Sequence, residues 1–530
     1  SLPSNLAYKK AYSHLAKFIM TNQDRWTNGI SYRQLVISTC IGVFQFWWHP
    51  YLQQERALIP FLVLYNILSI FVGYPALYLE LALGVVTRKN VIKCWDLAPY
   101  ARGIGLAMLS TCAFTAFGLG IVSAYSLALL VHSCHTFLPW LHCAASIKPP
   151  CAARHRPLSG DSETPAQSFF HNFVLNLKRD ELDSGLGNIV SELTVYYVVS
   201  WILVYFIAVN KIYSYSKLVI FKDSLAFLVV ICSVLGAFRL DGISIYFEKY
   251  DWNVLIEDPH IWRRALEYVI LELSISQGTF IMLGSYCKEK RFSLSNTALS
   301  TFMVSKCVTL AVSYVLASTH GALVKDYGAS TNITAESSAY SLIMWSDFVV
   351  RTPGSQFWSA LIFFTIFTLS ITSTVLLVQT IMSTFTGKSI YKISWAFLII
   401  LCFLFCLIGC FTVCTQSGIL ILDFLMYWPI SMPRTLIIAI VTAVVTYVYG
   451  QSQFSKDIFM ATGEHPSLFV RACWAISPGI LMALFCVGLG FWPHREKVAG
   501  WTLLVLSLLP AVAVMMFYLF FRFRVRVRSL

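Results

Sequence analysis

The sequence predicts an all-α polytopic membrane protein, and its composition and its apolar stretches both support this fold class. Of its 530 residues, 57% are hydrophobic and 12% are charged, whereas an ordinary soluble protein carries roughly 25% charged residues. A membrane-spanning helix needs roughly 20 apolar residues, and about twelve stretches of the chain meet that requirement. The expected spans are 31–54, 57–85, 101–132, 193–209, 214–237, 263–287, 296–320, 355–385, 392–413, 419–449, 467–491 and 500–523.

The basic residues fit the same fold class, although a formal net charge of +13 can also indicate nucleic acid binding. Lysine and arginine gather in short loops and at the ends of the chain, for example at Arg88 and Lys89 and in 288–291. Cytosolic loops of membrane proteins carry such an excess of positive charge. We therefore expect the lipid bilayer, and not a nucleic acid, to be the partner of this chain.

The spans are expected to form a single domain, 31–523, between a cytosolic segment, 1–30, and a basic cytosolic tail, 524–530. The first segment is polar and basic and shows no cleavable signal peptide, which favours a cytosolic start. An even number of spans places the other end on the same side. We expect a multi-pass protein of the plasma membrane with both termini in the cytosol.

Two of the longer polar segments, 133–192 and 321–353, are expected to be extracellular loops. The first contains Cys143 and Cys151, which can form a disulfide in an oxidising compartment; the alternative is two free thiols. The second contains Asn332, which begins a glycosylation sequon. The sequence thus predicts a disulfide-bonded glycoprotein.

The first and sixth spans are interrupted. Glycine, bulky aromatic residues and proline break the first in 42–50, and a polar cluster breaks the sixth in 274–278. Irregular backbone at bilayer depth is tolerated only where protein or a water-filled cavity supplies hydrogen-bond partners. Paired discontinuous helices in corresponding positions of an inverted repeat commonly hold the site of a secondary transporter. The alternative is that the polar residues only bond across a packed bundle.

Motifs along nearly the whole chain stand in the order and spacing of a known family. They comprise Trp47, Pro50, Tyr51, Tyr65, Gly73, Tyr74, Pro75, Glu80, Gly84, Gly103, Gly105, Leu138, Pro139, Trp140, Asp251, Trp252, Asp258, Pro259, Trp262, Ser285, Tyr286, Tyr449, Gly450, Phe454, Asp457, Ile458, Cys473, Trp474 and Pro478. On these residues the chain resembles a divergent member of the neurotransmitter:sodium symporter (solute carrier 6-like) family. The resemblance implies twelve helices with a five-plus-five inverted repeat. It also implies sodium-driven alternating access around a site between spans one, three, six, eight and ten.

The resemblance implies one intact sodium site. Main-chain oxygen atoms of Ser38 and Ile41 on the first span, and the eighth-span residues Leu369, Thr372 and Ser373, match the family's second sodium site. Hydroxyl and carbonyl oxygen atoms are the ligands that a small hard cation needs. Without the resemblance, the hydroxyl cluster indicates a helix-packing surface instead.

The family's first sodium site and its chloride site are expected to be degraded. Gln45 and Glu272 stand at sodium-ligand positions, and Tyr65 is kept at the chloride site, where Tyr268 replaces a glutamine. Chloride is therefore not expected to be required. Glu272 and Lys306 are charged residues at the middle of their spans, and pairing would remove most of the cost of burying them. The alternative is that Lys306 snorkels to the interface and that Glu272 binds sodium or a proton.

The matched substrate positions are mostly apolar. They are Cys40, Gly42, Phe44, Thr115, Leu119, Leu271, Ser274, Gln277, Ser373 and Leu377. Phe44, Leu119 and Leu271 replace residues that contact the amino-acid substrate in the family. Because an apolar pocket cannot compensate the desolvation of an ammonium and a carboxylate, we expect an apolar or weakly polar substrate, such as a lipophilic hormone or terpenoid.

The remaining site positions lie around this cavity. The gate positions are Arg25, Trp26, Trp48 and Met426, and Glu80 is expected to accept hydrogen bonds from N–H groups of the interrupted sixth span.

Three functions remain open from the sequence. The first is sodium-coupled transport of a small apolar solute, the second is sodium-dependent amino-acid symport, and the third is ligand binding without transport. No metal-ligand cluster, phosphate loop or nucleophile motif indicates an enzyme.

Overall fold

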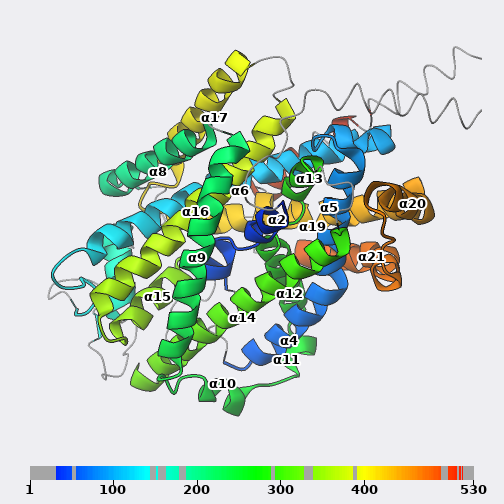
Figure 1. The fold of residues 1–530 in the computed structure, drawn as a ribbon. Coiled ribbons are helices and arrows are strands. Elements are labelled where there is room, and N and C mark those ends of the chain that lie inside the picture. Colours follow the sequence, from blue (N-terminus) through cyan, green and yellow to red (C-terminus); the bar gives the residue numbers. More distant parts are fainter. Residues whose placement is uncertain are drawn as a thin grey trace, which may run out of the picture.

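The fold is that of an α-helical bundle, seen in a computed structural model of the chain (Figure 1). The structure describes residues 32–49, 55–143, 151–152, 163–177, 187–209, 211–287, 293–327, 338–385, 391–490, 499–509, 512–514 and 516. In these residues the only β pairing is two isolated bridges, Cys151 with Glu163 and Ile189 with Thr415.

Nine helices of the described residues are long and apolar enough to cross a membrane. Six of them are single helices: α8 (Ser191–Val209), α9 (Lys211–Ala237), α14 (Leu294–Tyr327), α16 (Ser355–Phe385), α17 (Tyr391–Thr412) and α21 (Leu468–Gly490). Two more are Leu58–Thr87, made of α4 (Leu58–Leu68), η1 (Ser69–Gly73) and α5 (Tyr74–Thr87), and Pro99–Ser133, made of η3 (Pro99–Ala101) and α6 (Arg102–Ser133). The ninth is Gly418–Thr462, made of α18 (Gly418–Leu425), η6 (Met426–Ser431), α19 (Met432–Ala443), η7 (Val444–Gly450) and α20 (Gln451–Thr462). The shorter apolar helix Ala499–Leu509 lies in the last predicted span. The predicted all-α polytopic fold is confirmed.

The two predicted interruptions are present. The first span consists of α2 (Tyr32–Thr39) and α3 (Phe44–Trp47), and the sixth consists of α12 (His260–Glu272) and α13 (Thr279–Ser285). In the second break, Ser274 and Ser276 have positive φ angles of 54° and 65°, a conformation that is uncommon for residues other than glycine. Figure 1 shows α2 near the middle of the bundle. Most residues of both breaks are buried, among them Ile41 and Ser276.

A close helix contact explains one glycine of the family motif on α5. A Cβ atom on Gly84 would lie 2.4 Å from the carbonyl oxygen of Ile281 and 2.8 Å from the Cα atom of Gly284. Both neighbours are backbone atoms of α13 and cannot turn aside. The two glycines therefore let α5 and α13 approach closely, which holds the inner half of the interrupted span against a continuous helix.

The remaining helices cover the ends and sides of this central group. Figure 1 shows α8 and α17 together on one side of the bundle and α20 and α21 on the opposite side. The short elements are η2 (Lys93–Leu97), α7 (Pro165–Phe169), η4 (Phe170–Val174), α10 (Ser244–Lys249), α11 (Val254–Glu257) and α15 (Tyr340–Val350).

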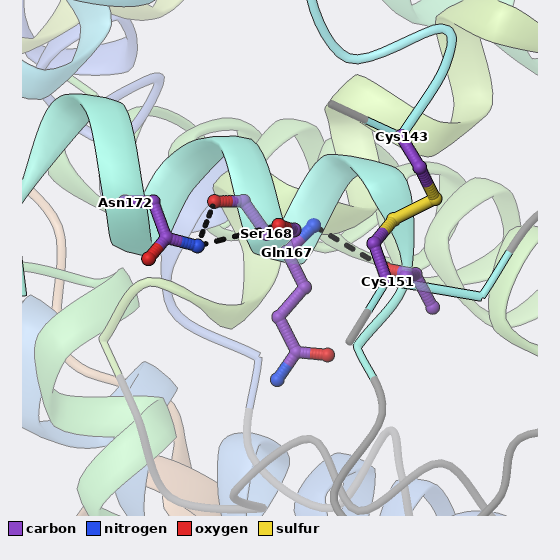
Figure 2. Close-up of a disulfide and its surroundings, with 6 residues drawn as sticks. Cys143, Cys151, Gln167, Ser168 and Asn172 are labelled. Carbon is purple, nitrogen blue, oxygen red and sulfur yellow. Dashed lines mark hydrogen bonds between the residues drawn. A yellow bond between two sulfur atoms is a disulfide. The ribbon is translucent and has the colours of Figure 1, made fainter. Parts of the chain in front are cut away.

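Both segments predicted as outer loops contain helices. In 321–353, α14 continues to Tyr327 and is followed by α15, whose residues are almost all buried. Much of this predicted loop is therefore helical and packs against the bundle. In 133–192, a disulfide joins Cys143 and Cys151 beside α7 (Figure 2). The predicted residues Arg25, Trp26 and Asn332, and the segments 1–30 and 524–530, lie outside the described residues.

Candidate functional site

A cavity lies between the two interruptions and the helices α6 and α16. Its lining residues are Ser38, Thr39, Ile41, Gly42, Phe44, Leu119, Glu272, Ser274, Gln277, Ser373, Leu376 and Leu377. Seven of the ten predicted substrate positions are among them, and Cys40, Thr115 and Leu271 are buried but do not line the cavity. Segments from four parts of the chain thus meet at one internal space, which is the arrangement expected of a binding site.

Gln45 closes hydrogen bonds within the break of the first span. Its Oε1 accepts a bond of 2.7 Å from the N–H of Gly42, and its Nε2 donates to the carbonyl oxygen of Cys40 and to Ser305 Oγ, the latter at 2.9 Å. Unpaired backbone groups at this depth would be costly. A residue that matches a sodium ligand of the family therefore stabilises the unwound backbone itself.

Glu80 does the same for the break of the sixth span. The N–H of Ser276 donates to Glu80 Oε1 over 2.7 Å, and Glu80 is fully buried on α5. This is the contact expected from the sequence. The carboxylate holds the N–H in place at the point where the helix hydrogen bonds stop.

Glu272 and Lys306 form a buried ion pair. Lys306 Nζ lies 2.7 Å from Glu272 Oε2 and 2.6 Å from Ser69 Oγ, and it lies 3.8 Å from the centroid of the Tyr65 ring. Lys306 is only 7% exposed, so it does not snorkel to the interface. The predicted pairing is present, and it joins α4, α12 and α14.

Hydroxyl groups complete the hydrogen bonds of the Glu272 carboxylate. Ser305 and Thr309 donate to Oε1 over 2.7 Å and 2.8 Å, and Tyr65 donates to Oε2. Tyr268 lies beside this network and bonds His49 Nδ1 over 2.9 Å. A buried ion pair is tolerated when the remaining lone pairs and protons are satisfied in this way. Side chains of the chain itself therefore fill the region expected to hold degraded sodium and chloride sites.

A second lysine lies at the predicted sodium site. Lys222 Nζ, on α9, donates to the carbonyl oxygen atoms of Ser38 and Ile41 over 2.8 Å and 2.7 Å. It also donates to Asp223 Oδ1 over 2.9 Å, and Ser38 Oγ donates to the same oxygen over 3.0 Å. Lys222 is 2% exposed. Its ammonium group thus takes both main-chain oxygen atoms that the family resemblance assigns to sodium.

The eighth-span part of that sodium site lies on α16. Thr372 Oγ1 donates to the carbonyl oxygen atoms of Thr368 and Leu369 over 2.8 Å and 3.1 Å. Ser373 lines the cavity next to Gly42. Of the five expected sodium ligands, the oxygen atoms of Ser38, Ile41 and Leu369 already accept hydrogen bonds within the protein.

An arginine stands behind the cavity wall. Arg434, on α19, is fully buried, and its Nη2 donates to Gln277 Oε1 over 2.7 Å and to Thr115 Oγ1. Its Nε and Nη1 have no hydrogen-bond partner among the described residues, although Glu80 is near enough to interact with its charge. A buried positive charge thus lies next to Gln277, a lining residue of the cavity.

Sequence reasoning missed Lys222, Asp223 and Arg434, although a signal was present. Each is an ionisable residue inside a predicted span, and such residues mark functional or paired positions. The same rule identifies Glu272 and Lys306. It applies equally to the fifth and tenth spans, where these three residues lie.

The gate positions on the described part of the chain are closed off from solvent. Trp48 and Met426 are both buried, as is Leu271. Trp48 and Trp47 are in contact, with ring centroids 5.7 Å apart. An aromatic layer therefore covers the break of the first span on its α3 side.

Comparison with known proteins gives one family and several relatives. The family model described as the sodium:neurotransmitter symporter family matches residues 23–523. A sodium-dependent nutrient amino acid transporter 1 of Drosophila grimshawi is 26% identical over 532 aligned residues, which cover 92% of this chain and 81% of the relative. A sodium- and chloride-dependent creatine transporter 1 of Bos taurus is 24% identical, over 92% of this chain and 82% of the relative.

Proposed function

Because the chain belongs to the sodium:neurotransmitter symporter family, we propose that it moves a small organic solute across the plasma membrane by alternating access. It is a multi-pass membrane transporter and not an enzyme. The observation that carries the proposal is the cavity between the two interrupted spans, because such breaks place free backbone groups around a solute near the bilayer midplane.

The lining favours a solute whose body is largely apolar. Phe44, Leu119, Leu376 and Leu377 are four of the residues around the cavity. Apolar side chains with a few placed polar groups are typical of small-molecule sites. The polar lining residues are Gln277, the serines and threonine of α2, the second break and α16, and Glu272. The Glu272 carboxylate is already paired with Lys306.

The polar end of that solute is an oxygen acceptor. Arg434 holds Gln277 from behind and keeps two N–H-bearing nitrogen atoms unpaired in the protein interior. A hydrogen bond from a guanidinium N–H group to a carboxylate is charge-assisted and therefore strong, and leaving buried N–H groups unpaired is unfavourable. We propose a small organic acid with one carboxylate, in place of the neutral lipophilic solute expected from the sequence.

The test uses purified full-length protein and three matched pairs of compounds. The acids are benzoate, phenylacetate and indole-3-acetate, and the neutral partners are their amides, with leucine and creatine added because the relatives are named for amino acids and creatine. Thermal stabilisation by the acids and not by the amides supports the proposal. A labelled acid that stabilises the protein is then followed into proteoliposomes.

Arg434→Gln is expected to abolish the difference between acid and amide, and Arg239→Gln, at an exposed arginine, serves as the matched control. Stabilisation by leucine or creatine alone would contradict the proposed substrate class. Binding of an acid without its uptake would contradict transport.

A further inference from the structure

We propose that the ammonium group of Lys222 replaces sodium at the second sodium site, so that the transport cycle of this chain runs without sodium. The inference rests on the transporter function proposed above for the cycle itself. The replacement of the ion is a property of the protein alone and can be tested without a known solute.

The hydrogen bonds of Lys222 are complete. An ammonium group has three donors and no acceptor, and here the three acceptors are Ser38 O, Ile41 O and Asp223 Oδ1, at 2.8, 2.7 and 2.9 Å. Sodium and an ammonium group are both compact cations that require oxygen atoms around them. Lys222 thus supplies the charge that the two carbonyl oxygen atoms would otherwise take from a dissolved ion.

Sodium cannot join this arrangement without expelling the lysine. It would share two oxygen atoms with a positive charge already in contact with them, and like charges at such distances repel strongly in a dry interior. If it displaced the ammonium group, Lys222 would lose two of its three hydrogen bonds while its side chain is 2% exposed. Leaving one buried charge without its partners is strongly unfavourable.

Asp223 links Lys222 to α2 through a second hydrogen bond. Its Oδ1 accepts from both Lys222 Nζ and Ser38 Oγ, and therefore ties the ammonium group to α2 by a second route. Lys306 makes an equivalent replacement at the other site, where it pairs with Glu272. Each position that the family resemblance assigns to sodium thus has a lysine of the chain beside it.

The covalent attachment of Lys222 changes how α2 and α9 can separate. A dissolved ion can leave and release the helices that it joins, whereas Lys222 is covalently fixed to α9. Separation of the α2 end from α9 must then come from movement of the helices and not from ion release. The sodium gradient supplies no energy to this step.

The test measures binding of radioactive sodium to purified full-length protein, together with thermal unfolding in NaCl and in KCl at equal ionic strength. For the unmodified protein we expect no saturable sodium binding and the same unfolding temperature in both salts. For Lys222→Ala we expect saturable binding of sodium, because Ser38 O, Ile41 O and the Asp223 carboxylate lose the ammonium group that occupies the space between them. The accompanying rise in unfolding temperature should be on the order of a few °C.

Lys325→Ala is the matched control, since Lys325 is an exposed lysine that bonds Ser244 Oγ over 3.0 Å; it should behave like the unmodified protein. Saturable sodium binding by the unmodified protein would overturn the inference. This measurement tests the inference even if Lys222→Ala does not fold. Failure of every compound in the uptake assay would bear on the proposed function and not on the ion.

Discussion

Two buried lysines lie at the two positions where the family resemblance places cation sites, and different kinds of acceptor hold them. Lys306 donates only to side chains, those of Glu272, Ser69 and Tyr65. Lys222 donates to two main-chain oxygen atoms at the break of the first span and to the carboxylate of its neighbour Asp223.

The difference separates a fixed contact from one that depends on conformation. The side-chain acceptors on α4, η1 and α12 remain available to Lys306 as long as these helices stay packed on α14. Two of the three acceptors of Lys222 are carbonyl oxygen atoms at the break of the first span, so their positions depend on the present form of the break. We infer that the Lys306 network stabilises the bundle and that the Lys222 contact stabilises one state of it.

The largest expected effect comes from breaking the fixed contact. Lys306→Met leaves Glu272 buried without its cation, which should lower the free energy of unfolding by about 3–5 kcal/mol. The double variant Lys306→Met with Glu272→Gln should recover most of that loss. Thermal unfolding of the purified proteins checks both values. Equal stability of the single and double variants would show that the pair is not coupled.

Arg434→Gln should weaken binding of the stabilising acid about tenfold to a hundredfold, because hydrogen bonds to charged groups contribute about 1.5–3 kcal/mol. Its amide should bind as before. Titration of both compounds against the variant provides the measurement. An equal loss for acid and amide would assign Arg434 a structural role.

Gly84→Ala should lower the free energy of unfolding by about 1–3 kcal/mol, since overpacking forces backbone shifts. The new methyl group would meet α13 backbone atoms, whereas a Cβ atom added to Gly479, in α21, would have nothing within 4 Å. Gly479→Ala should therefore be neutral or slightly stabilising. Similar melting curves for the two variants would contradict the close packing of α5 on α13.

The smallest expected effect is that of chloride. Glu272 provides a fixed negative charge beside Tyr65, where the family resemblance places the chloride site. Replacing chloride by gluconate at constant cation concentration should leave the unfolding temperature unchanged. A reproducible chloride-dependent shift, removed by Tyr65→Phe, would show that an anion still binds there.

The sequence predicted the architecture better than the charges inside it. Long apolar runs and the two breaks are local signals, and the contact of Glu80 with the second break follows from the family motif. The helix α15 was missed because its 11 residues are too few to form a membrane span, which needs roughly 20 apolar residues. Its burial comes from packing against distant helices.

Lys222 and Arg434 were missed for another reason. A single charge hardly changes the mean hydropathy of a long apolar stretch, so both spans have the pattern of plain membrane helices. Which acceptor such a residue meets depends on helices far along the chain: the carbonyl oxygen atoms of Ser38 and Ile41 for Lys222, and Gln277 for Arg434. Every residue carries a main-chain carbonyl group, so the sequence does not show which of these groups accepts a hydrogen bond from a buried charge.

The most direct test of the ion replacement is an electron cryo-microscopy map of the full-length protein prepared in NaCl. We predict continuous side-chain density from Lys222 to a point between the carbonyl oxygen atoms of Ser38 and Ile41. A separate density feature bound by those two oxygen atoms and by the hydroxyl groups of Thr372 and Ser373, with Lys222 turned away, would contradict the account.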